Sequence, residues 1–308
     1  MNSPKFAVYT LLIILCIFIA SSAQVFFPPI RGWNWIIVLL LMIAFVILLG
    51  KEINGRYGGI FINERFRMSL SRFQLVIWTL IVLSAFITIA LERVVAGVAD
   101  PLAIALPTQL WALLGISTAS LVGSPLILST KKTKKPNPEA IDKIAQSAAD
   151  ADPAISLSAI EEATEKIEEA KLIYTLGSKE LKDAEASLNK IKTKRQETID
   201  EAKLNIQKNS RAFGILASES DVNKAELSNL FTGDEIQNSK VIDMAKVQQF
   251  FFTIIIAFTY AFLLATMIWT TDPIELTSFP ELSDGLVALL GISSGGYITS
   301  KAIVHTKT

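Results

Sequence analysis

The sequence predicts an all-α integral membrane protein with six transmembrane helices, including two parallel-repeat hairpins, and a helical, coiled-coil-like cytoplasmic insert. The hexapeptide Ala-Leu-Leu-Gly-Ile-Ser at residues 112–117 recurs unchanged at residues 288–293. Both copies lie in apolar stretches of about the 20 residues that cross a bilayer. Between Lys131 and Lys246 the chain carries 21 acidic and 19 basic side chains of its 58. Such bunching indicates one polar domain inserted into a membrane protein.

The repeat extends upstream of the hexapeptide. Arg72-Phe73-Gln74 corresponds to Lys246-Val247-Gln248, and Trp78-Thr79 corresponds to Phe252-Thr253. Each copy is therefore a membrane hairpin, and such internal repeats decide the architecture. Both hairpins are expected to start from the cytoplasm and return to it. They are parallel copies, which predicts a pseudo-symmetry axis along the membrane normal and not the inverted repeats of many transporters.

Charges in the loops predict the orientation. Lys and Arg near the ends of spans collect on the cytoplasmic side. The segment between the last two spans is acidic and has no basic residue. We therefore expect both termini and the insert in the cytoplasm. The basic loop between the second and third spans carries five cationic side chains against two acids: Lys51, Arg56, Arg65, Arg67 and Arg72.

The predicted organisation has five parts. They are an N-terminal transmembrane hairpin (1–50), a basic cytoplasmic connector (51–73), hairpin repeat 1 (74–130), a cytoplasmic helical domain (131–246) and hairpin repeat 2 (247–308). The expected spans after the first are Trp35–Leu49, Gln74–Leu91, Pro107–Leu128, Gln248–Thr270 and Leu286–Val304.

Two segments each allow two structural interpretations. The first apolar stretch, Phe6–Phe27, is long enough to span, but the small residues before Gln24 also suit a signal-peptide cleavage site. Phe61–Phe73 is either an amphipathic helix at the interface or a plain loop. Arg72 and Lys246 are expected to extend toward the lipid headgroups.

The insert holds a heptad pattern from Ile160 to Ala202. Six heptads exceed the three or four that indicate a coiled coil. The pattern suits one long helix that associates between chains, which we favour slightly, or a hairpin that breaks at Gly177-Ser178 with Ser178 as the next N-cap. The core positions are Ile160, Ile167, Tyr174, Leu181, Leu188, Arg195 and Ala202, with Ala163, Ala170, Gly177, Ala184, Ile191 and Thr198.

Small residues recur at helical spacing in both copies of the repeat. Such faces let helices approach closely in lipid, whereas a hydroxyl-lined pore is the alternative use. Packing is the simpler interpretation. The face comprises Ser117, Ser120 and Ser124 in one copy and Ser293, Gly296 and Ser300 in the other. Gln74 and Gln248 lie at matching cytoplasmic entrances, either exposed or hydrogen-bonded to a neighbouring helix.

The composition argues against a catalytic, cofactor-binding or metal-binding site. With one cysteine, Cys16, the chain cannot form an intramolecular disulfide or a cysteine zinc cluster. With one histidine, His305, we expect no soft-metal or haem site and no Ser-His-Asp or Cys-His catalytic pair. No phosphate-binding loop, dinucleotide fingerprint or zinc-protease motif is present. No charged residue lies in the middle of an expected span. We therefore expect no catalytic, cofactor-binding or metal-binding residues, and the slightly acidic insert argues against nucleic acid.

The stretch Ser69-Leu70-Ser71-Arg72-Phe73-Gln74 with Trp78-Thr79, followed by Leu-Leu-Gly-Ile-Ser in both copies, resembles a bacterial membrane-protein family. The resemblance covers the two hairpins, about 120 of the 308 residues. It implies a bacterial inner membrane. The second copy departs from the pattern, with Lys246-Val247-Gln248 and Phe252 in place of Arg-Phe-Gln and Trp.

The sequence thus predicts a non-enzymatic, oligomeric inner-membrane anchor or scaffold. Its expected partners are the lipid bilayer, a second copy of the chain, and a cytoplasmic protein recruited through residues 160–202. The alternative is an ion or small-solute channel lined by the small-residue face of the sixth span.

Overall fold

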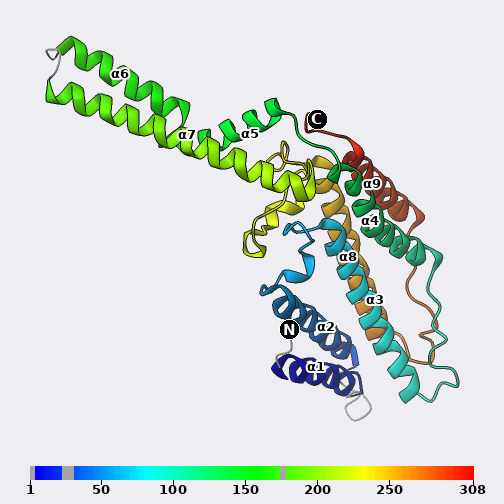
Figure 1. The fold of residues 1–308 in the computed structure, drawn as a ribbon. Coiled ribbons are helices and arrows are strands. Elements are labelled where there is room, and N and C mark those ends of the chain that lie inside the picture. The colour runs from blue at the N-terminus through cyan, green and yellow to red at the C-terminus, as the bar shows by residue number, and fades with distance from the viewer. Residues whose placement is uncertain (1–3, 23–30, 174–177) are drawn as a thin grey trace. The chain divides into compact units, whose positions relative to one another are not determined.

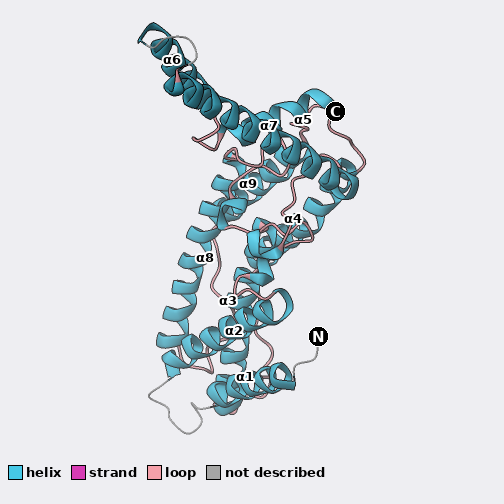
Figure 2. Ribbon diagram, turned by 60° about the vertical axis from the view of Figure 1, so that its left-hand side comes forward, coloured by secondary structure: helices cyan, strands magenta, loops and turns pink. Residues whose placement is uncertain are grey.

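The computed structural model describes residues 4–22, 31–173 and 178–308, and its regular elements there are helices (Figure 1). Coloured by secondary structure, the described residues show helices and loops without strands, which confirms the all-α class (Figure 2). The few backbone bridges are isolated pairs.

Four helices among the described residues are long and apolar enough to cross a membrane. They are α2 (Arg31–Asn54), α3 (Leu70–Val95), α4 (Thr108–Lys132) and α8 (Met244–Thr270). The first expected span falls on α1 (Pro4–Ser22) and continues into residues 23–27, outside the described residues. The sixth falls on α9 (Asp284–Ala302), whose serines and glycines lower its hydropathy. Six spans therefore stay a prediction.

The chain divides into two compact units. Unit 1 contains Met1–Leu128, Glu219–Gly233 and Val241–Ile303; unit 2 contains Ser129–Ser218, Asp234–Lys240 and Val304–Thr308. The last part of the predicted insert is thus shared between the units. Ala225 and Leu230 of the insert pack in one apolar cluster with Ile62 and Met68 of the connector, which explains why this stretch belongs to unit 1.

The core of unit 1 lies between α3 and α8, which run side by side in both views (Figures 1 and 2). Trp78 of α3 contacts Tyr260 of α8 with ring centroids 6.1 Å apart, and both side chains are fully buried. Helix α2 packs against this pair, and the indole N–H of Trp35 donates to the Ser84 hydroxyl over 3.0 Å. This hydrogen bond pairs two polar atoms at the contact between α2 and α3.

The connector before α3 is a loop with one short 3₁₀ helix, η3 (Gly59–Phe61), and not an interfacial helix. Its arginines are not at the surface either. Arg65 and Arg67 are buried, and Arg67 donates to the Thr232 hydroxyl over 3.0 Å. Backbone carbonyls in a loop lack the hydrogen bonds that a helix would give them. The guanidinium groups donate hydrogen bonds to such oxygen atoms and to a nearby hydroxyl.

The expectation that Arg72 and Lys246 extend to headgroups is wrong for the same reason. Arg72 donates to the carbonyl of Ile62 over 2.7 Å. Lys246, 3% exposed, donates to the carbonyl of Thr232 over 2.6 Å. Both cations therefore bind loop backbone within unit 1.

Unit 2 is built on three helices, α5 (Pro138–Asp150), α6 (Leu157–Ile173) and α7 (Lys179–Phe213). Helices α6 and α7 pack against each other as an antiparallel hairpin (Figure 1). The single long helix that the sequence slightly favoured is therefore wrong, and the hairpin alternative holds. Ser178 caps α7 by accepting a hydrogen bond from the Leu181 N–H, as expected. Residues 174–177 at the break lie outside the described residues.

Candidate functional site

The two hairpin repeats contact each other at equivalent positions, beginning with their connecting loops. Ala105, between α3 and α4, forms a parallel bridge with Ser278, between α8 and α9. The N–H of Ala105 donates to the Thr277 carbonyl over 2.8 Å, and the N–H of Phe279 donates to the Ala105 carbonyl over 2.9 Å. The sequence separation across this bridge, 173 residues, is close to the repeat length.

The two copies of the hexapeptide also lie side by side. A Cβ atom built on Gly291 of α9 would lie 3.6 Å from Cδ1 of Ile116 on α4. One on Gly123 of α4 would lie 3.8 Å from Cδ1 of Ile298 on α9. Both pairs are separated by 175 residues, so α4 and α9 run parallel with equivalent turns at equal height. Gly291 and Gly123 therefore each lie next to an isoleucine on the corresponding helix of the other hairpin.

A pair of amides joins the first helices of the hairpins. The Gln249 side-chain N–H₂ donates to Oε1 of Gln74 over 3.1 Å and to the hydroxyl of Ser294 over 2.7 Å. Gln74 and Gln249 are fully buried and Ser294 is 3% exposed. The amide pair therefore bridges α3, α8 and α9 within the core.

Gln74 pairs with Gln249, the neighbour of Gln248, which the repeat matches to Gln74. Gln248 is exposed on α8, whereas Gln249 points into the core. One residue turns a helix by about 100°, so a one-residue error in aligning the repeats selects the wrong face. The matches of Arg72 with Lys246 and Trp78 with Phe252 favour Gln248, so no sequence signal pointed to Gln249.

A hydroxyl pair continues this polar line from α3 to α9. Tyr297 of α9, fully buried, shares a hydrogen bond of 3.0 Å with the Ser71 hydroxyl of α3. The ammonium of Lys301, one turn later, lies 4.7 Å from the centre of the Tyr297 ring. We call Ser71, Gln74, Gln249, Ser294 and Tyr297 the polar cluster.

Several buried polar atoms in and near the polar cluster have no hydrogen-bond partner within the described residues. A buried polar atom without a partner costs about 1–3 kcal/mol, and such sites commonly bind water. Two N–H groups, one amide oxygen and three hydroxyls are thus able to bind water or a polar solute. They belong to Gln74 (Nε2), Trp78 (Nε1), Gln249 (Oε1), Ser117, Ser120 and Ser293.

The structure places the six small residues of the predicted face differently in the two copies. On α4, Ser117, Ser120 and Ser124 are all buried. On α9, Ser293 is buried and Ser300 is half-buried, with its hydroxyl donating to the Tyr297 carbonyl over 2.9 Å. Gly296 lies on the exposed side, with open space where a Cβ would be.

The buried residues of α9 differ from the predicted face because burial of Tyr297 sets the orientation of the helix. Its buried residues are Leu290, Ser293, Ser294, Tyr297 and Lys301. A large aromatic side chain gains more from burial than a glycine, so the helix turns Tyr297 inward and Gly296 outward. The small-residue pattern alone gave no weight to this neighbour.

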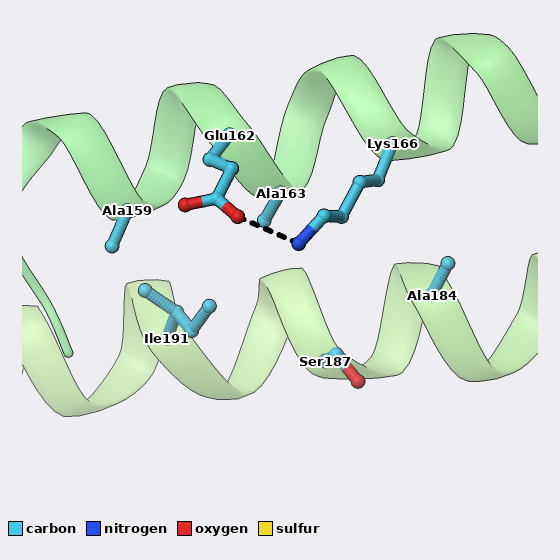
Figure 3. Close-up of a pocket in the computed structure, with 7 residues that line it drawn as sticks. All are labelled: Ala159, Glu162, Ala163, Lys166, Ala184, Ser187 and Ile191. Atoms are coloured by element: carbon cyan, nitrogen blue, oxygen red, sulfur yellow. Dashed lines mark hydrogen bonds and ion pairs between the residues drawn. The ribbon is translucent and has the colours of Figure 1, made fainter.

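The second candidate site is the groove between α6 and α7, which Figure 3 shows from the side. Its volume is about 390 Å³. Small side chains line both walls, and the Glu162–Lys166 ion pair of 2.7 Å spans one turn of α6 at its edge (Figure 3). The lining residues are Ala159, Glu162, Ala163 and Lys166 of α6 with Ala184, Ser187 and Ile191 of α7.

The predicted heptad positions form the seam of this hairpin. Every described position of the pattern is buried or half-buried, while the residues between them are mostly exposed. Arg195, the unexpected cation in the seam, donates to the Asp150 carboxylate over 2.7 Å and to the Ile155 carbonyl over 3.0 Å. The heptad is therefore used within one chain: α7 packs against α6, and its positions Arg195 and Ala202 contact α5 and the loop after it.

Sequence reasoning missed a buried ion pair in unit 2. Lys131, expected as an ordinary cytoplasmic flank, lies 2.6 Å from Glu235 with both side chains at most 3% exposed. The other oxygen of Glu235 accepts from the backbone N–H groups of His305 and Thr306. This carboxylate therefore holds the end of α4 and the C-terminal tail together. The partners are 104 and about 70 positions apart in sequence, so no local signal could have revealed them.

Among the described residues, no group of three His, Cys, Asp or Glu side chains is placed to hold a metal ion. No protein-family model, no curated protein and no solved structure matches this chain.

Proposed function

We propose that the protein is a non-enzymatic, oligomeric anchor or scaffold of a bacterial inner membrane, whose cytoplasmic hairpin α6–α7 recruits a protein partner. In this proposal α1 and α9 join the four apolar helices as spans, and both termini are cytoplasmic. The polar cluster then packs the two repeat hairpins together and carries out no chemistry.

Exposed apolar side chains on the candidate spans support the anchoring part. Phe258 and Phe262 of α8 are 76% and 68% exposed, and Leu40 of α2 is 57% exposed. Large apolar side chains in such numbers on one unit are unfavourable in water and favourable in hydrocarbon. The side of α8 that faces Trp78 and Gln74 is buried instead, so α8 has one protein-facing and one lipid-facing side.

The recruitment part rests on one observation, the incomplete burial of the α6–α7 hairpin. Of the described residues of α6, only Ile167 is buried. In proteins most helix stability comes from packing an apolar face against other elements. A helix with one buried side chain beside an open groove gains most from a further helix placed on it.

A shortened chain tests this proposal. Residues 159–192 are replaced by a Gly/Ser linker, which keeps α5, Arg195 and Ile199 at the base of the hairpin. Full-length and shortened chains are cross-linked in native membranes, and their cross-linked partners are identified by mass spectrometry. The proposal predicts that both chains integrate into the membrane and that only the full-length chain retains its cross-linked protein. Identical cross-links from both chains would contradict it.

A second candidate, a channel for ions or small solutes, is favoured by the buried hydroxyls of Ser117, Ser120 and Ser293, which lack partners among the described residues. Hydroxyls can replace water around a permeating solute. The purified chain in liposomes would then show a flux that Ser120→Leu abolishes and Gly296→Leu leaves unchanged, because Gly296 faces outward.

A further inference from the structure

The α6–α7 hairpin carries opposite charges on its two helices. Helix α6 has five acidic side chains and two basic ones, whereas the stretch of α7 from Lys179 to Arg195 has six basic side chains and three acidic ones. The contrast is sharpest at residues 190–194, which hold three exposed cations, Lys190, Lys192 and Lys194, and no acid. The acids of α6 are Glu161, Glu162, Glu165, Glu168 and Glu169.

These charges are directed outward from the hairpin. Glu161, Glu165, Lys190 and Lys194 are all exposed. Among the described residues, the ion pair at this part of the hairpin is Glu162–Lys166, which lies within α6. The opposite charges of α6 and α7 are therefore not used to join the two helices to each other. They are free to pair with another surface.

We propose that this surface belongs to a second copy of the chain, with α6 of each copy against α7 of the other over the groove. In a two-fold contact, residue i touches j and j touches i. An acidic helix and a basic helix then meet twice, so each copy complements the other. Complementary charges on facing helices decide which partner pairs.

The groove and the hairpin tip fit this arrangement. Three alanines and a serine are among the residues that line the groove, together with Ile191 and the Glu162–Lys166 ion pair of α6 (Figure 3). The small side chains leave room for a helix to approach, and the ion pair adds charge at the groove. At the end of α6, Leu172 and Ile173 are 88% and 75% exposed. Contact between two hairpins would cover these apolar side chains, which water disfavours.

The inference deepens the proposed function, in which the hairpin is the interaction element, by identifying the partner. It is tested on the full-length chain in detergent with two charge-reversal variants. The acidic-side variant carries Glu161→Lys and Glu165→Lys; the basic-side variant carries Lys190→Glu and Lys194→Glu. A control, Lys208→Glu with Arg211→Glu, reverses two exposed charges of α7 outside the groove.

Light scattering of the purified chains gives their mass. Wild type and control are expected at twice the chain mass of 33.8 kDa. Each reversal variant is expected to raise the dissociation constant by about tenfold or more, since each contact then juxtaposes like charges. Mixing the two variants restores the dimer, because α6 of one then opposes α7 of the other with opposite sign. Wild type at the mass of one chain, or folded variants whose mixture does not pair, would overturn the proposal.

A second measurement applies even if a reversal variant does not fold. Two separately tagged chains carry Cys16→Ser together with one new cysteine each, Glu165→Cys in one and Lys190→Cys in the other. Mixed oxidation is expected to join 165 to 190 at least several-fold more than it joins 165 to a Lys208→Cys chain. Equal yields would overturn the pairing. Hairpin-dependent capture of another protein without either result would leave the anchoring and recruitment parts of the proposed function intact and remove only the second copy.

Discussion

The buried side-chain amide of Gln249 donates a hydrogen bond to Oε1 of Gln74 over 3.1 Å, joining the first helices of the two repeat hairpins. Replacing one member leaves the other amide buried without its partner, which costs about 1–3 kcal/mol, whereas replacing both is nearly neutral. Gln249→Leu is therefore expected to lower the free energy of unfolding in detergent by about 1 kcal/mol or more.

The neighbouring glutamine supplies the control for this pair. Gln248→Leu changes an exposed side chain and is expected to leave the unfolding transition unchanged. The double variant Gln74→Leu with Gln249→Leu should recover part of the stability lost in Gln249→Leu, because only the hydrogen bond to Ser294 is then left unmade. Equal losses for Gln248→Leu and Gln249→Leu would show that the amide pair does not stabilise the fold.

Glu235 is expected to be the most sensitive carboxylate of unit 2. Glu235→Gln removes the buried carboxylate that lies 2.6 Å from the Lys131 ammonium, and breaking a buried pair in this way costs about 3–5 kcal/mol. The substitution also weakens the hydrogen bonds that this side chain accepts from the backbone N–H groups of His305 and Thr306 in the C-terminal tail. Carboxypeptidase should then shorten the C-terminus faster than in wild type.

Glu139→Gln is the matched control, since Glu139 contacts Lys143 and Lys307 at exposed positions. Exposed pairs contribute about 0–1 kcal/mol. If both variants shorten at the rate of wild type, the Glu235 contact does not hold the tail.

The base of the hairpin should respond to acid. A hydrogen bond from Arg195 lowers the pKa of Asp150 below its ordinary value of 3.8. The stability that this pair contributes is therefore complete above that value and is lost as pH falls through the lowered pKa. Unfolding of wild type and Asp150→Asn is compared from about pH 7 to about pH 3. The difference between the two curves should shrink as the pH falls below 3.8, and Asp183→Asn, at an exposed position of α7, should follow wild type throughout. A constant difference between wild type and Asp150→Asn at every pH would exclude the titration of this pair as its cause.

Gly214 ends α7 where no other residue fits. Its φ is +62°, and an added Cβ would lie 2.4 Å from the Lys131 carbonyl oxygen and 2.5 Å from that of Lys132. Gly214→Ala therefore adds a steric clash to the cost of about 1–2 kcal/mol for a left-handed backbone. Gly55→Ala, at φ +70° with open space around it, isolates the backbone cost alone. Gly214→Ala should lower the unfolding temperature clearly more than Gly55→Ala; equal shifts would contradict the close approach.

The repeat and the heptad predicted which residues would meet, but not all of their partners. The repeated hexapeptide lies on α4 and α9, where Ile116 and Gly291 come close. Heptad positions such as Ile167 and Leu181 are buried. A heptad pattern is the same whether the second helix comes from the same chain or from another chain. Periodicity therefore could not distinguish the hairpin from a long helix that pairs between chains.

Residues with distant partners lay beyond local reasoning. Lys131 looks like any flanking lysine until Glu235, 104 positions later, is placed beside it. Gln249 and Gln248 are chemically identical, and only the orientation of α8 separates the buried amide from the exposed one. The orientation of α9 likewise depends on Tyr297, whose bulk outweighs the small residues beside it.

The most direct test of the account is the mass of the detergent-solubilised protein with and without residues 159–192. The account predicts an oligomer for the full chain and a single chain of about 30 kDa for the shortened one, scaled from 33.8 kDa, because the hairpin is the interaction element. An oligomer that survives the deletion would contradict it and would place assembly on the membrane helices instead.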